Sequence, residues 1–297
     1  MKIEQYAAID IGSNAVRILI SNVISSKKEP PKFMKSSIVR VPIRLGEDSF
    51  TVGEISEKNK KRVVKAMKAF KHIMKISNVK AYMACATSAL REANNAEEVV
   101  QLVKKNTGIH IQIIDGKREA EIISTTNIFE SINKNKTFLF IDVGGGSTEF
   151  SILVKGERII SKSFKVGTVR MINKMVSDKI WFEIQNWIEQ NTQEHSKIAL
   201  LGSGGNINKL FKIAGIKEGR PLSYIKLNTL YKELNKLTYE ERIVQWELNP
   251  DRSDVIIPAT QIYLKALQWS GASEIYVPKI GLADGMIKVL YANSKKK

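Results

Sequence analysis

The residues best suited to chemistry lie in the segment FLFIDVGGGSTEFSILV, residues 138–154, where an apolar run breaks and then resumes. The break consists of polar and glycine residues: Asp142, Gly144, Gly145, Gly146, Ser147, Thr148 and Glu149. Successive glycines let backbone N–H groups approach an anion closely, and the two hydroxyls add donors. Carboxylates such as Asp142 and Glu149 are ligands that Mg²⁺ accepts beside waters and phosphate oxygens. Three successive glycines weaken a strand, because they have no side chains to pack. The segment therefore predicts phosphate and metal binding.

Two further turns offer the same chemistry in weaker form. The first turn supplies Asp10 as a third candidate metal ligand, and its candidate phosphate ligands are Gly12, Ser13, Asn14 and Arg17. The turn GSGGN, residues 202–206, is another backbone cradle, with Gly204 and Gly205 as candidate phosphate ligands. Taken alone, each turn is equally typical of a tight connection that needs glycine for its backbone angles.

Two charged residues lie outside these turns. Arg91 follows the strand-like ACATSAL, where an arginine can hold a phosphate through two hydrogen bonds or form an ordinary helix salt bridge. Glu119 lies in DGKREAEII, where an acid in the first turn of a helix is favoured by the helix dipole, with Asp115 as a cap. On its position alone, Glu119 needs no function beyond that.

The elements that must position these residues alternate between strand-like and helix-like segments, which predicts an α/β fold. AAIDIGSNAVRILI and FLFIDVGGGSTEFSILV share one pattern of strand, aspartate, glycine, small polar turn and strand. AYMACATSALREA in the first half and KIALLGSGGNINKL in the second share a strand–loop–helix pattern. An internal repeat of this length predicts two copies of one ββ-β-α-β-α unit.

The repeat also predicts the domains. Domain I is expected over residues 1–121, rejoined by a C-terminal helix at 282–297, and domain II over residues 122–281, with the boundary between about Glu121 and Lys136. The two halves are expected to face each other across a cleft into which both Asp-Gly turns point. Hinge closure over a substrate is an expected property of two domains around a cleft.

Charge is the unusual bulk property of the 297-residue chain. Lys and Arg number 47 against 30 acids, a net charge of +17 that attracts nucleic acid, an acidic membrane or a polyphosphorylated substrate, or that reflects only solvated lysines. The lysine-covered helix SEKNKKRVVKAMKAFKHIMKI, residues 56–76, reads as solvated. No apolar stretch approaches the roughly 20 residues of a membrane helix. The single cysteine, Cys85, favours a reducing compartment, the cytoplasm.

Taken together, these motifs resemble the exopolyphosphatase / guanosine pentaphosphate phosphohydrolase (Ppx/GppA) family in its short two-domain form. The resemblance rests on DIGSNAVRILI, with Ala15 in place of the usual serine, on ATSALREANN and RSDVIIPATQIYL, and on a full match at DVGGGSTEFSI. The family belongs to the acetate kinase, sugar kinase, heat-shock chaperone and actin superfamily. The resemblance therefore implies two duplicated ribonuclease H-like (actin-like ATPase) domains, with mixed five-stranded sheets flanked by helices and an active-site cleft between them.

The resemblance also implies residue roles. Glu119 would be the general base, Asp142 and Glu149 would bind Mg²⁺ or Mn²⁺, and the turns and Arg91 would bind phosphates. The chain departs from the family pattern at Arg118, where a Glu is usual, at Asn206, where many members have Thr, and at Ala283, where many have Arg. It also lacks the long C-terminal helical extension of some members, which puts a preference for long polyphosphate in doubt.

The predicted function is metal-dependent hydrolysis of the terminal phosphate of inorganic polyphosphate, releasing orthophosphate. The alternative within the family is hydrolysis of guanosine pentaphosphate to tetraphosphate. A kinase of the same superfamily, or a non-catalytic sensor of polyanions or nucleotides, remains open at this stage. No membrane or specific nucleic-acid partner is expected, and a homodimer is left open.

Overall fold

The computed structural model describes residues 1–126, 136–195 and 197–295. The chain forms two compact units: unit 1 comprises Met1–Thr126 and Leu282–Lys297, and unit 2 comprises Asn127–Gly281. The segment expected to join the two domains, residues 121–136, lies largely outside the described residues. The C-terminal helix α13 (Leu282–Lys295) belongs to unit 1, so the chain crosses from one unit to the other and back.

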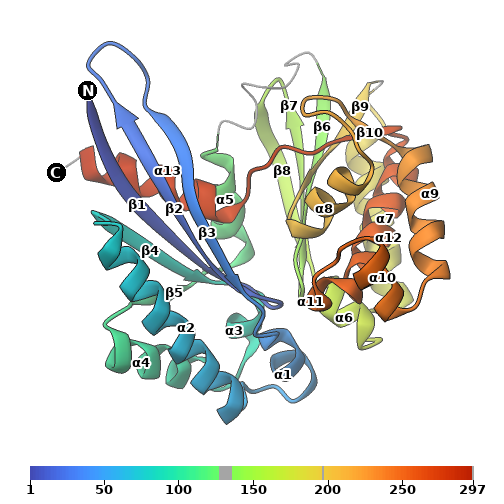
Figure 1. Ribbon diagram of the computed structural model, residues 1–297. Coiled ribbons are helices and arrows are strands. Elements are labelled where there is room, and N and C mark those ends of the chain that lie inside the picture. Colours follow the sequence, from blue (N-terminus) through green and yellow to red (C-terminus); the bar gives the residue numbers. More distant parts are fainter. Residues whose placement is uncertain (127–135, 196, 296–297) are drawn as a thin grey trace. The chain divides into compact units, whose positions relative to one another are not determined.

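Unit 1 is built on a five-stranded mixed sheet (Figure 1). In the spatial order β3-β2-β1-β4-β5, the strands are β3 (Lys32–Val41), β2 (Val16–Ser25), β1 (Lys2–Ile11), β4 (Ala81–Ala86) and β5 (Ile111–Ile113). β1, β2 and β3 pair antiparallel, whereas β4 and β5 run parallel to β1. The carboxyl ends of β1, β4 and β5 therefore meet at one edge of the sheet.

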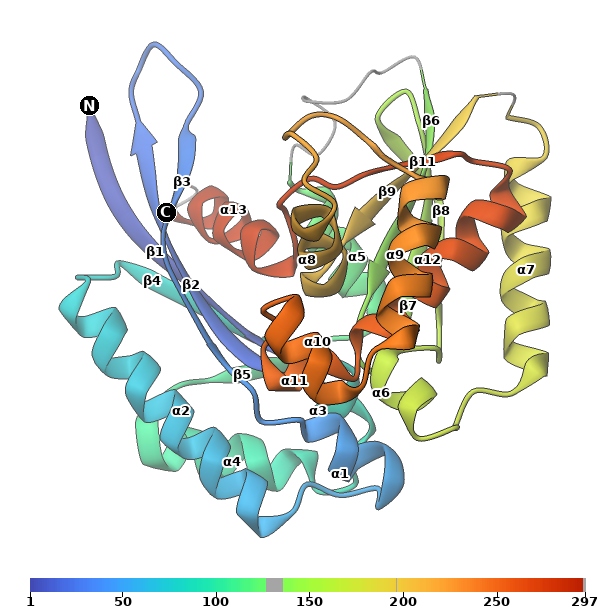
Figure 2. The same cartoon turned by 45° about the vertical axis from the view of Figure 1, so that its right-hand side comes forward.

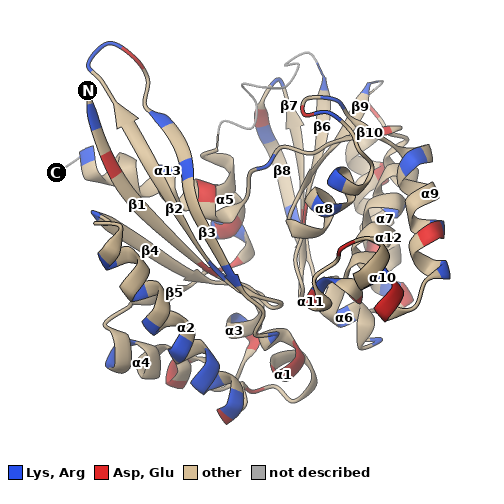
Figure 3. Cartoon of the chain, in the orientation of Figure 1, with Lys and Arg blue, Asp and Glu red and all other residues tan. Residues whose placement is uncertain are grey.

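Helices flank both faces of this sheet (Figures 1 and 2). They are α1 (Leu45–Thr51), α2 (Glu57–Ile76), α3 (Ser88–Glu92), α4 (Ala96–Thr107), α5 (Gly116–Ser124) and α13. α2 begins at Ser56, whose hydroxyl accepts from the Asn59 amide at 3.3 Å, and it buries an apolar stripe while lysines line its outer face (Figure 3). α4 ends at Gly108, which has a φ of 75°, as the sequence predicts.

Unit 2 repeats the topology of unit 1 and extends it. Its six-stranded sheet has the order β10 (Leu222–Ser223), β11 (Glu274–Tyr276), β9 (Ile198–Ser203), β6 (Thr137–Val143), β7 (Thr148–Val154) and β8 (Glu157–Phe164). β6, β7 and β8 pair antiparallel, and β9 and β11 run parallel to β6, as β4 and β5 do to β1. The short strand β10 has no counterpart in unit 1.

The helices of unit 2 enclose a large apolar core. They are α6 (Thr168–Ile172), α7 (Asp178–Thr192), α8 (Gly205–Ile213), α9 (Tyr224–Lys236), α10 (Tyr239–Gln245), α11 (Pro250–Ser253) and α12 (Ile256–Ser270). α12 packs against α7, α8 and α9, and its buried side chains meet those of β6 and β9 (Figure 2). The predicted mixed α/β fold with two duplicated sheets is confirmed, with one added strand in the second sheet.

Candidate active site

The two hairpin turns of the repeat have the same local geometry. In unit 2 the Gly144 amide donates to the Ser147 carbonyl at 2.9 Å, and in unit 1 the Gly12 amide donates to the Ala15 carbonyl at 3.1 Å. Each turn thus joins an aspartate-bearing strand to the next strand in one tight step. The residues opposite the two aspartates are therefore directly comparable.

Those opposite residues carry opposite charges. Register pairs Asp10 with Arg17 in unit 1 and Asp142 with Glu149 in unit 2. Arg17 forms an ion pair with Asp10, with Nη2 2.6 Å and Nε 2.8 Å from Oδ2. In unit 2 the equivalent position brings a second carboxylate, and like charges directly opposite each other on paired strands are destabilising. The two turns are therefore built for different chemistry.

The backbone of the glycine loop in unit 2 is oriented by the start of α6. The carbonyls of Gly144 and Gly145 accept from the amides of Thr168 and Val169 at 3.1 and 2.9 Å, and Arg170 Nε donates to the Gly146 carbonyl at 2.8 Å. In a trans peptide the C=O and the following N–H point in opposite directions. The amides that follow these carbonyls therefore point away from α6.

These amides are suited to hold an anion. Over residues 1–126, 136–195 and 197–295, the N–H groups of Gly145 and Gly146 donate to no other group. Successive N–H groups on one side of a glycine loop form a concave site for phosphate. The structure thus supplies a physical reason for the glycine tract that the sequence singles out.

Small and buried residues keep this loop close to α6. A Cβ added at Gly167 would lie 2.4 Å from the Gly145 carbonyl oxygen, so only glycine fits there. Thr148, predicted to bind phosphate, is fully buried, and its hydroxyl donates to the Val166 carbonyl at 2.6 Å. The Thr148 hydroxyl thus supports the loop from within unit 2.

The Glu149 carboxylate is positioned by two hydroxyls. Its Oε1 accepts from Ser147 Oγ at 2.7 Å and from Ser163 Oγ at 3.0 Å. Glu149 is only 4% exposed and Ser147 6%, so the carboxylate has a defined orientation in a partly desolvated place. Ser147, predicted to bind phosphate, thus contacts the candidate metal ligand.

The third turn lies beside Asp142. Register pairs Asp142 with Ser203, and a Cβ added at Gly204 would lie 3.3 Å from Asp142 Oδ1. Gly204 has a φ of 107°, and Gly205 begins α8. The structure therefore brings Gly204 and Gly205 next to the glycine loop, with the N-terminus of α8 at the same edge of the sheet.

Arg252 lies at this helix N-terminus, and Lys209 lies one turn further along α8, where its Nζ donates to the Glu247 carbonyl at 3.1 Å. The Arg252 guanidinium donates to the Gly205 carbonyl and packs against that glycine, where an added Cβ would lie 2.9 Å from Nη2. Burial lowers the pKa of Lys209, and the nearby charges of Lys212 and Arg252 lower it further. A helix N-terminus with an added guanidinium is a favourable environment for an anion.

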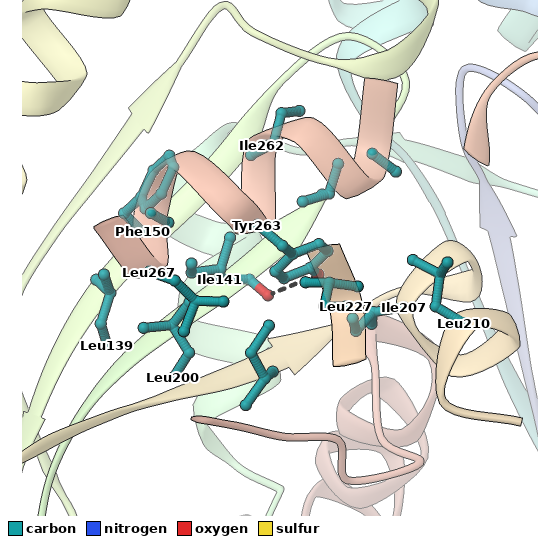
Figure 4. Packing of buried hydrophobic residues seen from close by; sticks show 14 of the residues in the cluster. Leu139, Ile141, Phe150, Leu200, Ile207, Leu210, Leu227, Ile262, Tyr263 and Leu267 are labelled. Atoms are coloured by element: carbon teal, nitrogen blue, oxygen red, sulfur yellow. Dashed lines mark hydrogen bonds between the residues drawn. The ribbon is translucent and has the colours of Figure 1, made fainter. Parts of the chain in front are cut away.

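Tyr263 on α12 holds the two strands that end at these turns (Figure 4). Its hydroxyl donates to the carbonyl of Ser203 at 2.6 Å and lies 3.4 Å from that of Ile141. Burial, with the Asp142 charge as a further cause, raises the pKa of Tyr263 well above its ordinary value. The hydroxyl therefore stays a neutral donor and fixes the ends of β6 and β9.

In unit 1, the first turn is anchored to α3 and α1. Ser13, predicted to bind phosphate, is buried, and its Oγ lies 2.9 Å from Ser88 Oγ. The amides of Arg44 and Gly46 donate to the carbonyls of Asn14 and Ser13 at 3.0 and 2.8 Å. The turn therefore has a fixed shape at the edge of the sheet where β1 and β4 end.

Glu119 and Arg91 meet at this edge of unit 1. Asp115 caps α5, as its position predicts, by accepting from the Arg118 amide at 2.7 Å. This places Glu119, 8% exposed, in the first turn of α5. Arg91 Nη1 lies 4.0 Å from Glu119 Oε2 and donates to the Ile114 carbonyl at 2.7 Å.

Asp10 and Glu119 both lie near enough to Cys85 for their charges to affect its pKa. Burial, with the charges of Asp10 and Glu119 as further causes, raises the pKa of Cys85 to about 12, against a lowering by Arg118. Cys85 thus stays a thiol and packs as a small core residue. The two carboxylates gather at the ends of β1, β4 and β5.

The carboxylate pair of unit 2 fits a hard divalent cation. Asp142 and Glu149 supply oxygen ligands, and Mg²⁺ commonly takes one or two carboxylates and completes its shell with waters and phosphate oxygens. Among the described residues, no group of three or more His, Cys, Asp or Glu side chains could hold a metal ion by itself. Two carboxylates leave coordination positions that waters and phosphate oxygens can fill.

Sequence reasoning missed four contributors: Ser163, Gly167, Arg170 and Arg252. Arg252 lies in the RSDVIIPATQIYL segment, whose resemblance to the family was a usable signal. The other three act through contacts between distant parts of the chain, for which the sequence offers no local pattern. No helix within the described part of the chain is long and apolar enough to cross a membrane.

Comparison with known proteins shows what the chain resembles. Residues 23–293 match the Ppx/GppA phosphatase family. The bifunctional 3-dehydroquinate synthase/phosphatase of Fusobacterium nucleatum is 30% identical over 91% of this chain, which spans only 44% of that protein's length. Exopolyphosphatase 1 of Mycobacterium tuberculosis is 24% identical and covers 94% of this chain and 86% of its own length.

Solved structures of two proteins are similar to this chain over nearly its whole length. An exopolyphosphatase from Cytophaga hutchinsonii superposes with a TM-score of 0.81 at 25% identity, covering 99% of this chain and 98% of that one. The Aquifex aeolicus Ppx/GppA family member has a TM-score of 0.77 at 22% identity, with 99% of both chains covered, and shows the shared fold. These findings confirm the predicted family and its class of hydrolase: the chain belongs to the Ppx/GppA phosphatase family.

Proposed function

We propose that this protein is a metal-dependent exopolyphosphatase that releases orthophosphate from the end of inorganic polyphosphate. The observation that carries the proposal is the pairing of Asp142 with Glu149 beside a glycine loop whose amides point away from α6. Two carboxylates and a row of backbone donors form a site for a divalent cation together with phosphate. The exopolyphosphatases among the relatives and solved structures support polyphosphate as the substrate.

The reaction is hydrolysis of a phosphoanhydride bond. A water oxygen forms a bond to the terminal phosphorus, the bridging P–O bond breaks, and orthophosphate leaves the shortened chain. Glu119 would accept the proton of that water, because it is a carboxylate held at a helix start with Arg91 nearby. Phosphoryl transfer depends mostly on positioning and charge neutralisation, which the backbone cradles supply.

The metal ligands in this proposal are Asp142 and Glu149. A bound Mg²⁺ or Mn²⁺ would neutralise charge on the phosphate oxygens. Asp10 forms an ion pair with Arg17, which already neutralises the carboxylate, so we assign the cation to the turn of unit 2. Arg252 and Lys209 would add positive charge where the phosphate chain meets α8.

The experiment that tests the proposal compares substrates. Orthophosphate release by the full chain with Mg²⁺ is measured on long-chain polyphosphate and on guanosine pentaphosphate, at equal concentrations of terminal phosphate. We expect faster release from polyphosphate. Preference for guanosine pentaphosphate would assign the other activity of the family, and polyphosphate binding without release would indicate a sensor.

A further inference from the structure

The exposed face of α2 carries a straight line of basic residues. We call this line the α2 stripe: Lys58, Lys61, Lys65, Lys68, His72 and Lys75. The spacing alternates between three and four residues, so the side chains follow one face of the helix. At 1.5 Å per residue, the stripe is about 25 Å long.

The lysines of the α2 stripe lie outside the close ion pairs of this helix, although the charge of Lys61 acts on Glu57. Lys60, buried on the same helix, pairs with Glu57 at 2.8 Å and Glu98 at 2.5 Å, and Arg62 donates to the Asn59 side chain at 2.9 Å. None of the stripe lysines forms such a pair with a described residue. Like charges three and four residues apart repel one another, so the stripe opposes helix formation unless an anion lies along it.

This helix concentrates the charge of the whole chain. α2 has eight Lys and Arg residues against one Glu, a net charge of +7 of the +17 of the protein. Lysine and arginine colour its outer face in Figure 3. A solvated helix is usually covered by both signs of charge, whereas this face has almost only one.

The stripe starts at the edge of unit 1 that holds Asp10 and Glu119. α2 precedes β4, which runs parallel to β1, so its N-terminus lies toward the carboxyl ends of these strands. Arg62 Nη1 donates to the Ile43 carbonyl at 2.9 Å, and the Gly46 amide nearby donates to the Ser13 carbonyl of the first turn. From there the stripe leads away along the unit.

We propose that the α2 stripe is a tether for the non-reacting part of a long polyphosphate chain. The inference rests on the proposed function and extends it by naming how chain length is recognised. A polyanion without bases fits this face, because Phe70, the one Phe, Tyr or Trp residue of α2, is buried and leaves His72 as the one ring of the stripe on which a base could stack. The stripe would then provide binding length along unit 1 beyond the site of the reaction.

The test replaces three stripe lysines and compares them with three exposed lysines on α9 of unit 2. The stripe variant is Lys61→Gln, Lys65→Gln and Lys68→Gln, and the control variant is Lys226→Gln, Lys232→Gln and Lys236→Gln. Both lose the same charge on exposed helix faces. Binding of fluorescently labelled long-chain polyphosphate to each full-length protein is measured by anisotropy, and orthophosphate release from long-chain polyphosphate and from tripolyphosphate is measured in parallel.

We expect the stripe variant to bind long-chain polyphosphate about tenfold more weakly, with a shallower dependence on salt, while the control changes little. The KM for long-chain polyphosphate should rise, and kinetics with tripolyphosphate, which is too short to follow the stripe, should not change. Equal binding by the stripe and control variants would overturn the tether.

Two further outcomes distinguish the tether from the proposed hydrolysis and from a surface that binds nucleic acid. If wild-type protein releases no orthophosphate yet the stripe variant alone loses polyphosphate binding, the proposed function fails and the tether stands. A duplex DNA of matched charge, measured in the same assay, should bind more weakly than polyphosphate. Tighter binding of the DNA, lost in the stripe variant, would identify a nucleic-acid surface and contradict the proposal.

Discussion

Asp10 and Asp142 occupy the same place in the repeat, yet one faces Arg17 and the other Glu149. An arginine neutralises its aspartate without help, since the pair is 2.6 Å apart. Two carboxylates on paired strands repel each other, and the hydroxyls of Ser147 and Ser163 orient Glu149. At the scale of single residues, this difference is the reason why we propose the metal at the turn of unit 2.

Glu119→Gln tests the general base. We expect turnover of polyphosphate to fall about 100-fold or more while polyphosphate binding survives, because the amide cannot accept the proton of the water. Glu121→Gln on the same helix is the control, since its carboxylate pairs with Arg118 at 3.1 Å. Unchanged turnover in Glu119→Gln would remove this residue from the mechanism.

The lowered pKa of Lys209 predicts that the affinity for polyphosphate depends on pH. Because burial lowers the pKa of Lys209, this side chain loses its charge at a lower pH than an exposed lysine does. Affinity for polyphosphate should therefore be complete below that lowered pKa and decline as the pH rises through it. Lys209→Arg keeps its charge at alkaline pH and should abolish the decline. An identical alkaline decline in both proteins would exclude Lys209 as its source.

At the scale of elements, the site depends on the contact between α6 and the glycine loop. The two are separated in sequence by β7 and β8, yet α6 orients three successive carbonyls of the loop. Gly167 makes the contact possible, because a side chain there would collide with the loop backbone. Although α6 has only five residues, it fixes the orientation of the backbone of the glycine loop.

Gly167→Ala tests this contact. The added Cβ would lie 2.4 Å from the Gly145 carbonyl oxygen, so the loop or the helix must move, at a cost of about 1 to 3 kcal/mol in the free energy of unfolding. Turnover should fall as well, because the amides of the loop shift. In Gly281→Ala, the control, the nearest such contact is an ordinary 3.9 Å. Urea unfolding and orthophosphate release that match in the two variants would contradict the proposed support.

The same scale shows what sequence can predict. The hairpins, the capped start of α5 and the end of α4 at Gly108 follow from local patterns, and the repeat predicts the paired sheets. Contacts such as that between Ser13 and Ser88, or between Arg170 and Gly146, depend on packing across many residues. Phosphate binding by Arg17 stays a prediction, and its pairing with Asp10 could not be foreseen, because register is not visible in a single motif.

At the scale of the whole molecule, a net charge of +17 favours the attraction of a polyanion, which agrees with the proposed substrate. Its concentration on α2 was not predicted, because the helix alone reads as solvated. The missing information was the edge of the sheet from which the helix starts. That placement turns a lysine-rich surface into a candidate path for substrate.

Ionic strength should therefore affect capture more than chemistry. We expect kcat/KM for long-chain polyphosphate to fall steeply between about 0.05 and 0.3 M salt, because the Debye screening length shortens to below about 10 Å over this range. The value of kcat should stay nearly constant. Initial rates over a range of substrate concentrations at each salt concentration measure both quantities. A kcat that falls in parallel with kcat/KM would show that salt acts on the reaction step instead.

The magnesium dependence of orthophosphate release tests most sharply whether Asp142 and Glu149 hold the metal. Release from long-chain polyphosphate is titrated with Mg²⁺, after chelation of residual metal, in wild type, Glu149→Gln and Arg17→Gln. We expect no release without metal, a midpoint at least about tenfold higher in Glu149→Gln, and an unchanged midpoint in Arg17→Gln. Release that persists in chelator, or equal midpoints in wild type and Glu149→Gln, would contradict the assignment of the metal to Asp142 and Glu149.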